Sequence, residues 1–378
     1  MSEYWKHQLS KIIDYMTRQK RPGVLMMVTG ATLAAGPKLL SFVFKGTFHG
    51  ESLSISTAEG NVVSDYIVPI IGGILVLAGL VFLSIGEYQS IKQNSRKRIL
   101  LITGNGLRTT TGTGLDKVVR TVLKGLIQPR DIDITQRIRD GVVIEPESTF
   151  NRQILPEKDI ITQILCKGEP DLTQVAYGGF LPVPFTFFLG NVLDDKGDVT
   201  VFDWDRKDEK WKHISSNNID DGESFVHETI IESTSDQIVL VVSCSYRVNI
   251  EQVTRSFAGQ GIEHIYLETN RFDNHWSLAK QRRLSLEFAE KIKTLSMQGI
   301  RTVHLILSAQ SSIVLNFGRR YDNRNMADVI VYQYEQSNIN PYPWGVYGLS
   351  HRYENSGIVM RPDLKAKLLI IISLRFVY

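Results

Sequence analysis

The 378-residue sequence predicts a two-helix transmembrane hairpin followed by a tandem of two α/β lobes. Two long apolar segments near the N-terminus predict the hairpin, because each is long enough to cross the hydrocarbon layer of a bilayer. After them, strand-like and helix-like patterns alternate along the chain, which is typical of an α/β fold with a largely parallel sheet. An internal repeat in that part predicts that the α/β unit occurs twice.

Composition and charge exclude several classes of protein. With 43% hydrophobic and 22% charged residues, the chain is neither disordered nor collagenous. A net charge of +3 argues against a general nucleic-acid coat. Cys166 and Cys244 form no CxxC pair, which excludes a cysteine zinc ribbon or a disulfide framework and fits a reducing compartment. The eight histidines are scattered without a ligand spacing, so no metal site is predicted.

The two apolar segments occupy residues 23–44 and 66–86. The first contains one charge, Lys38, which is costly in the bilayer unless it snorkels or pairs, and the second contains none. We do not expect a cleaved signal peptide, because the charged region ahead runs 22 residues and no A-x-A site follows. Small residues in the second segment permit close helix contact: Gly72, Gly73, Ala78 and Gly79.

The distribution of Lys and Arg predicts the orientation of the hairpin. Residues 1–22 carry five of them, the connection 45–65 carries only Lys45 against three acidic residues, and four follow the second span within 92–98. Positive flanks stay in the cytoplasm, so both ends of the hairpin are expected there. An apolar stripe at helical spacing in residues 1–16 predicts either an interfacial helix or a cytosolic extension of the first span.

The cytoplasmic part begins with a buried strand at 99–103, a glycine-rich loop at 103–114 and an amphipathic helix at 115–126. Runs of apolar and β-branched residues predict further strands near 142–144, 173–177, 199–204, 238–245, 262–269, 301–308 and 328–334. Helical periodicity predicts helices near 157–166, 250–258, 277–297 and 310–318.

Landmarks of the repeat recur in the same order. They are a glycine after a helix, an Asp-Val that opens a strand, and a later tryptophan: Gly190 and Gly318, Asp198 and Asp328, Trp211 and Trp344. Upstream, ILLITGN (99–105) is similar to IVLVVSC (238–244). The offset is 139 residues at the first strand, 128 at the glycine and 130 at the Asp. We therefore predict a hairpin over 1–98 and two lobes, 99–235 and 236–378.

The C-terminal half resembles a known family. Segments 277–295, 302–322 and 327–335 resemble the SAVED domain, and a hairpin ahead of it resembles the transmembrane SAVED effectors of bacterial CBASS antiphage systems. The resemblance implies that the lobes are two fused Rossmann-like units of the CARF type. The tail 356–378 departs from the family's usual end, and its apolar run 368–374 would be an aggregation hazard unless it is buried as a strand.

By this resemblance the protein is a non-enzymatic receptor in the bacterial inner membrane, with two spans and a cytoplasmic SAVED domain. Its ligand would be a cyclic di- or trinucleotide made by a partner nucleotidyltransferase, and binding would drive oligomerisation and disruption of the lipid bilayer. No cofactor and no DNA or RNA polymer is expected. The alternative is a membrane-tethered nucleotide-binding enzyme, such as a cyclic-oligonucleotide-degrading CARF relative. Asp203, Asp205 and Lys207 could form a nuclease centre, but a solvated strand end is favoured.

Loops at strand ends supply the predicted ligand-binding residues. The first follows strand 99–103 and offers Gly104, Asn105, Gly106 and Arg108, where backbone N–H groups can line an anion site at a helix N-terminus. The loop could equally be a tight strand-to-helix turn. A bulky residue at position 106 is expected to block ligand binding and leave the fold intact. In the second copy Arg247 occupies the matching place.

Other strand ends complete the predicted cleft, a role that the resemblance assigns. Small side chains would leave room for a nucleotide, Gln310 could read a base edge, and Phe185 would either stack on a base or lie in the core. Arginine and tryptophan suit phosphates and purines. The residues from these loops are Phe185, Asn270, Arg271, Trp276, Ser308, Ala309, Gln310 and Ser311.

Overall fold

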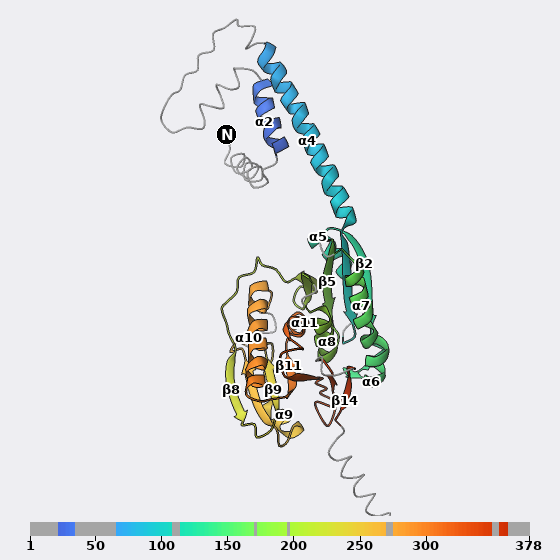
Figure 1. Cartoon of the computed structure of the whole chain (residues 1–378), viewed down its shortest axis with the longest axis vertical. Helices are drawn as coiled ribbons and strands as arrows, with labels where there is room; N and C mark the ends of the chain where they lie inside the picture. Colours follow the sequence, from blue (N-terminus) through green and yellow to red (C-terminus); the bar gives the residue numbers. More distant parts are fainter. Residues whose placement is uncertain are drawn as a thin grey trace, which may run out of the picture. The chain divides into compact units, whose positions relative to one another are not determined.

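The computed structural model divides the chain into two compact units, Met1–Ser95 and Arg96–Tyr378, each of which is described by itself (Figure 1). The structure describes residues 22–34, 66–107, 114–169, 172–194, 197–269, 275–349 and 355–361.

The first unit contains two apolar helices, α2 (Pro22–Ala34) and α4 (Val68–Arg96). Within α4, Val68–Gly86 is long and apolar enough to cross a membrane, with a hydropathy of 2.6. Helix α2 is apolar but shorter than a span, and the remainder of the predicted first span, residues 35–44, lies outside the described residues. The described part of the chain therefore contains one helix of spanning length where the sequence predicts two.

Helices α2 and α4 pack through two pairs of buried glycines. Gly23 faces Gly79 and Gly30 faces Gly72, so closely that a Cβ on Gly72 would lie 2.6 Å from the Gly30 carbonyl oxygen. In each helix the two glycines are seven residues apart, which is about two turns and places them on one face. Gly73 has no atom of another residue near its Cβ position. Gly72 and Gly79, which the sequence predicts to permit close helix contact, make this contact with α2.

The second unit contains two sheets. In the first, four parallel strands and one antiparallel edge strand run in the order β2-β1-β5-β6-β7. Its strands are β1 (Arg98–Asn105), β2 (Leu126–Asp133), β5 (Thr173–Gly179), β6 (Val199–Asp205) and β7 (Lys210–His213). Its helices are α5 (Leu115–Val122), α6 (Pro146–Thr149), α7 (Leu155–Lys167) and α8 (Val183–Leu193), with a 3-10 turn η2 (Thr135–Arg137), a π-helical turn η3 (Phe150–Ile154) and a small hairpin of β3 (Ile138–Arg139) and β4 (Val142–Val143).

The second sheet has the order β14-β13-β12-β11-β9-β10-β8. Strands β10, β9, β11 and β12 are parallel, and β8, β13 and β14 pair antiparallel with their neighbours. The strands are β8 (Val226–Ile231), β9 (Gln237–Ser243), β10 (Gly261–Tyr266), β11 (Thr302–Ser308), β12 (Asp328–Tyr332), β13 (Trp344–Tyr347) and β14 (Gly357–Met360). The helices are α9 (Ile250–Ser256), α10 (Leu278–Met297) and α11 (Ser311–Arg320).

The two sheets share one strand order over five strands. Strands β2-β1-β5-β6-β7 correspond in order and direction to β10-β9-β11-β12-β13. The central pairs also share a register, since Arg98 lies beside Thr173 and Gln237 lies beside Thr302. Landmarks found in the sequence therefore occupy equivalent strands: Asp-Val opens β6 and β12, and the tryptophans lie on β7 and β13.

Helices α8 and α11 cross between the two sheets (Figure 1). Their landmark glycines touch: a Cβ on Gly190 would lie 2.2 Å from the Leu315 carbonyl oxygen, and one on Gly318 would lie 2.2 Å from that of Phe187. This close approach requires glycine on both helices. One hydrophobic core consequently runs through both lobes, from Val175 to Leu305.

A network of charges fastens the connection between the sheets to α10. Lys280, which is 1% exposed, donates from Nζ to Asp221 at 2.6 Å and to Glu223 at 3.0 Å. Arg283 forms a two-point contact with Asp220 through Nε and Nη2. A buried lysine is tolerated because carboxylates surround it.

Several strands lie outside those that the sequence predicts, among them β2, β7, β8, β13 and β14. At β2 the sequence predicts only the end of a helix, up to Leu126. The residues of β2, LIQPRDID, are mostly polar or half-exposed because it is an edge strand, where Pro129 costs no internal ladder bond. Strand β8 pairs with β10, so the second sheet begins ahead of the predicted lobe boundary at 235/236. In the tail, β14 extends the second sheet and the Arg361 guanidinium lies 3.6 Å from the centroid of the Phe257 ring, whereas residues 368–374 lie outside the described residues.

Candidate functional site

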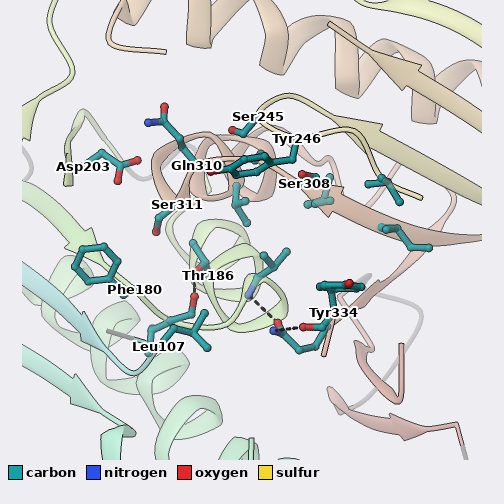
Figure 2. Close-up of a pocket in the computed structure, with 18 of the residues that line it drawn as sticks. Leu107, Phe180, Thr186, Asp203, Ser245, Tyr246, Ser308, Gln310, Ser311 and Tyr334 are labelled. Atoms are coloured by element: carbon teal, nitrogen blue, oxygen red, sulfur yellow. Dashed lines mark hydrogen bonds between the residues drawn. The ribbon is translucent and has the colours of Figure 1, made fainter. Parts of the chain in front are cut away.

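A cavity of about 720 Å³ opens where the two lobes meet, at the carboxyl ends of the parallel strands (Figure 2). Residues that follow β1, β5, β6, β9, β11 and β12 all contribute to it. In open α/β sheets ligands bind at this end of the strands, and the volume falls within the ordinary range of small-molecule sites. Its polar and aromatic lining includes Phe180, Thr186, Asp203, Trp204, Arg206, Lys207, Ser245, Tyr246, Arg247, Asn249, Gln252, Ser308, Gln310, Ser311, Gln333, Tyr334 and Tyr342.

The repeat places equivalent residues on the wall of the cavity. By the offset of 139 residues Leu107 corresponds to Tyr246, and both line it. By the offset of 130 residues Trp204 corresponds to Tyr334, and both line it as well. The cavity is therefore built from matching positions of the two lobes.

Each lobe caps the site helix of the other lobe. Asp203, at the end of β6, accepts a hydrogen bond from the Ser312 amide of α11, with Oδ2 3.0 Å from the nitrogen. Gln333, the equivalent residue after β12, accepts one from the Val183 amide of α8, with Oε1 3.2 Å away. These contacts satisfy amides in the first turns of the helices, which have no partner within the helix. The two caps differ in charge.

Asp203 is a carboxylate in the wall of the cavity, and its residue is 5% exposed. Oδ1 also accepts from the Trp204 amide at 2.8 Å. Burial raises the pKa of this carboxyl above its ordinary value, against the lowering effect of the hydrogen bonds from Ser312 and Trp204.

Basic side chains line the solvent side of the cavity. Arg206, Lys207 and Arg247 are exposed and contribute to its lining. Arg206 Nη1 donates to the Tyr246 hydroxyl at 3.2 Å, which joins the end of β6 to the loop after β9. The Arg247 guanidinium lies 3.4 Å from the centroid of the Tyr266 ring, a cation–π contact that orients it.

The loop after β11 forms a wall of small side chains. The Ser308 carbonyl accepts the amides of Cys244 at 2.8 Å and Ser245 at 3.0 Å, which holds the two loops together. The hydroxyls of Ser311 and Tyr177 are 3.5 Å apart. The Ser245 hydroxyl is buried, lines the cavity and has no hydrogen-bond partner among the described residues. A buried hydroxyl without a partner is unusual, and a polar ligand in the cavity would satisfy it.

The structure brings together some of the predicted site residues and separates the others. Arg247, Ser308, Ala309, Gln310 and Ser311 line the cavity. Arg108, Asn270 and Arg271 lie outside the described residues. The remaining predictions, Gly104, Asn105, Gly106, Phe185 and Trp276, are not among the residues that line it.

Packing explains why those five lie elsewhere. Gly104 packs against Leu181, and a Cβ on Gly106 would lie 3.0 Å from Ile134, so a bulky residue there would disturb the core instead of a ligand. Asn105 ends β1 beside Asp133. Phe185 is fully buried, 5.2 Å from Trp344 between ring centroids, and cannot stack on a base.

Trp276 is half-buried and lies beneath the Lys212 ammonium, 4.5 Å from the ring centroid. Lys212 lies on β7, the edge strand of the first sheet, and neither residue lines the cavity.

The suggested nuclease pair does not converge. Asp203 faces the cavity, whereas Asp205 accepts the amides of Lys207 and Asp208 in a turn and lies 3.7 Å from the Lys212 ammonium. Both residues are 5% exposed, so the expected solvated strand end is also wrong. Within the described residues, no cluster of His, Cys, Asp and Glu could hold a metal ion.

Sequence reasoning missed Leu107, Asp203, Tyr246, Gln333 and Tyr334 as cavity residues. The internal repeat could have identified them, because its offsets make Leu107 equivalent to Tyr246 and Asp203 equivalent to Gln333. Residues at equivalent strand ends of two facing lobes are expected to share one site.

Comparison with known proteins identifies two family models in the chain. Residues 159–347 match the SAVED model, described as a SMODS-associated and fused to various effectors sensor domain. Residues 2–150 match the model of a SAVED-fused 2TM effector domain. No curated protein matches the chain.

Several solved structures are similar to this chain. An Acinetobacter baumannii Cap4 SAVED/CARF-domain receptor with the cyclic trinucleotide 2'3'3'-cAAA has 13% identity and a TM-score of 0.48, over 76% of this chain and 60% of that one. The same receptor with 3'3'3'-cAAA has 11% identity and a TM-score of 0.45, over 72% and 58%. A Moraxella osloensis Cap4 receptor has 12% identity and a TM-score of 0.42, over 71% and 52%. The present chain thus spans at most 60% of these proteins.

Proposed function

Because the chain belongs to the SAVED family, with a SAVED-fused 2TM effector domain ahead of its sensor domain, we propose that it is a membrane-anchored receptor for a cyclic oligonucleotide. The ligand binds in the cavity between the lobes, subunits oligomerise, and the 2TM domain disrupts the bacterial inner membrane. Both termini of the membrane hairpin and the SAVED domain are cytoplasmic. A partner nucleotidyltransferase supplies the ligand, a cyclic di- or trinucleotide.

One observation carries this proposal: the cavity combines the groups that a nucleotide requires. Its exposed basic residues, Arg206, Lys207 and Arg247, suit phosphates. Its aromatic residues, Tyr246 and Tyr334, offer flat apolar surfaces on which bases can stack. The buried Ser245 hydroxyl, which has no partner in the part of the chain that the structure describes, can form a hydrogen bond with a ligand.

Support for a membrane role comes from α4. The side chains of its apolar segment point outward, with Leu77 65% exposed and Ile70 61% exposed, which suits contact with lipid. A ligand that binds the assembled state more tightly than the free state would shift the equilibrium toward assembly. In this proposal the SAVED domain senses the ligand and the 2TM domain disrupts the membrane.

Dye release from liposomes tests the proposal. Full-length protein should release an enclosed dye only after one member of a panel of cyclic di- and trinucleotides is added. A form lacking residues 1–95 should still bind that ligand and release no dye. Leu77→Arg should cost about 2.5–3.5 kcal/mol of insertion at the helix centre and suppress release.

Two outcomes would contradict the proposal. Dye release without ligand would remove the cavity as the trigger. Conversion of the ligand to a cleaved product would favour the alternative function, a membrane-tethered enzyme that degrades a cyclic oligonucleotide.

A further inference from the structure

The two caps in the cavity make its two ends chemically different. At the N-terminus of α8 the cap is the neutral amide of Gln333, and at the N-terminus of α11 it is the carboxyl group of Asp203. Among the described lining residues Asp203 is the only acid, while Arg206, Lys207 and Arg247 are basic. Equivalent positions of the two lobes line the cavity, but they carry different chemical groups, so the two ends of the cavity are not equivalent.

A carboxylate at this position changes what the α11 end can bind. A helix N-terminus normally favours anions, but at α11 the Asp203 carboxyl group already accepts the Ser312 amide and occupies that position. A phosphate placed there would bring its acceptor oxygens against those of Asp203, whereas a hydrogen-bond donor would meet an acceptor. The phosphates are left with the basic side of the cavity.

Hydroxyl groups also lie at the start of α11, and the positive charge of Arg206 acts on Asp203. The hydroxyls of Tyr177 and Ser311 lie 3.5 Å apart at the start of α11. Ser245, on the loop after β9, supplies a buried hydroxyl that has no hydrogen-bond partner among the described residues (Figure 2). Hydroxyls can donate or accept as a ligand demands, so they do not set its polarity. Asp203 does set it, because both of its carboxyl oxygens act as acceptors, Oδ2 for the Ser312 amide and Oδ1 for the Trp204 amide.

Resting on the proposed function, we propose that Asp203 is the specificity-determining residue of the site, and that it selects a base carrying an exocyclic amine. Adenine, cytosine and guanine present such a donor. In place of the guanine amine, hypoxanthine carries a hydrogen atom, which cannot donate to Asp203. In place of the adenine amine, hypoxanthine presents a carbonyl oxygen, as uracil does in place of the cytosine amine. Opposite Asp203 that oxygen would meet another acceptor, with repulsion in place of a hydrogen bond. The amine directs its base to the α11 end and leaves the phosphates to Arg206, Lys207 and Arg247.

Paired binding measurements test this. The full-length protein in detergent is titrated with cyclic di- and trinucleotides of all four bases. Its tightest ligand is then compared with analogues in which one amine-bearing base at a time is replaced by hypoxanthine, or by uracil for cytosine. One analogue should bind about tenfold to a hundredfold more weakly, as expected when a buried acceptor loses its hydrogen-bond partner. Asp203→Asn should reduce that ratio to about threefold or less.

Two further variants isolate the role of this side chain. Asp203→Gln copies the neutral amide of the equivalent position 333 and should also lose the preference, so a folding defect of one variant does not decide the outcome. Asp205→Asn is the matched control, because Asp205 is equally buried on the same strand but does not line the cavity. It should keep the wild-type ratio, and thermal melting should show that the tested variants are folded.

The outcomes separate this inference from the proposed function. If the wild-type protein binds a cyclic oligonucleotide but tolerates loss of every amine, or if its best ligand contains only uracil, the inference fails and the receptor proposal stands. A preference that persists in both Asp203 variants also overturns it. If no member of the panel binds, the receptor proposal fails, and this inference fails with it.

Discussion

Ser245 illustrates how a single side chain can be suboptimal for folding and suitable for binding. The Ser245 amide donates a hydrogen bond to the Ser308 carbonyl oxygen, which holds the residue at the cavity. The Ser245 hydroxyl has no partner among the described residues. Leaving a buried hydroxyl unpaired costs free energy in the empty protein. The cost is recovered when a ligand supplies the missing partner.

We predict that Ser245→Ala lowers ligand affinity without lowering stability. Removing a hydroxyl that has no partner should leave the free energy of unfolding unchanged or raise it by up to about 1 kcal/mol. Affinity should fall about twofold to tenfold, as for one neutral hydrogen bond. Calorimetric binding and denaturant unfolding measure the two effects.

The control for this variant is Ser285→Ala. Ser285 is also buried, but its hydroxyl donates to the Gln281 carbonyl within α10, and it does not line the cavity. It should keep the wild-type affinity. Equal affinity of Ser245→Ala and the wild-type protein would remove Ser245 from the binding site.

His275 is fully buried beside the cavity-forming loops. Its Nε2 lies 3.1 Å from the Cys244 carbonyl oxygen and therefore donates to it, while Nδ1 has no partner among the described residues. Burial, followed by the positive charge of Lys280, lowers the pKa of His275 to about 4. The native protein thus keeps this ring neutral where an unfolded chain would protonate it.

We predict that stability falls as the pH falls below the ordinary histidine value of 6.5 toward about 4. In that window the unfolded chain binds a proton that the native protein does not, so the free energy of unfolding decreases with decreasing pH. Between pH 7.5 and pH 5 the contribution is on the order of 2 kcal/mol. Denaturant unfolding of the protein in detergent at several pH values measures it.

His275→Gln isolates this contribution, since glutamine can still donate to the Cys244 carbonyl but does not titrate. The variant should lose less stability between pH 7.5 and pH 5 than the wild-type protein does. Identical pH profiles would show that His275 is not the titrating group.

Helices pack at glycines in both units of this protein. In the hairpin, Gly23 and Gly30 of α2 meet Gly79 and Gly72 of α4, so the two helix backbones touch. In apolar surroundings, where burial of side chains gives little driving force, such close contact is a main source of helix association. The contact between α2 and α4 is therefore made at four residues that lack side chains.

Adjacent glycines of α4 provide a matched test of this packing. Gly72→Leu should separate α2 from α4, because even a Cβ there would lie 2.4 Å from the Ala34 amide nitrogen. Gly73→Leu should not, because its Cβ position is open. Hydrogen exchange of Pro22–Ala34, measured on the full chain in lipid nanodiscs, should rise in the first variant alone. Equal exchange in the two variants would contradict this packing.

The two lobes of the SAVED domain form one structural whole. Their sheets share a core through the crossing of α8 and α11, and Phe187 of α8 packs against Phe288 and Tyr321 of the second lobe, with ring centroids 6.2 and 6.1 Å apart. A shared core makes the stability of each lobe depend on the other. A ligand bound between them can then act on both.

We predict that residues of both sheets unfold together. Phe187→Ala should lower the opening free energy of amides in β1 and β9 by a similar amount, about 3–5 kcal/mol, because it empties a fully buried site between the lobes. Met297→Ala, at an 80% exposed position, should change either by less than about 0.5 kcal/mol. Native-state hydrogen exchange measures both, and loss of protection confined to β1 would contradict a shared core.

The sequence alone determined the features that depend on local composition and order along the chain. The apolar run that ends at Gly86 predicts a helix of spanning length, and alternation with repeated landmarks predicts an α/β fold whose strands were mostly found where expected. The sequence does not predict strand β2, because an edge strand is half-exposed and its residues show neither a buried run nor a clear alternation.

Only the tertiary structure decided which residues share the cavity. Gly106 and Phe185 follow the expected strand ends, yet neighbouring side chains from other elements bury them. Asp203 and Gln333 become cavity residues because each reaches the helix of the opposite lobe. Local sequence sets the strands and helices, but the side of a loop that faces a ligand depends on contacts between residues more than a hundred positions apart, which no local pattern encodes.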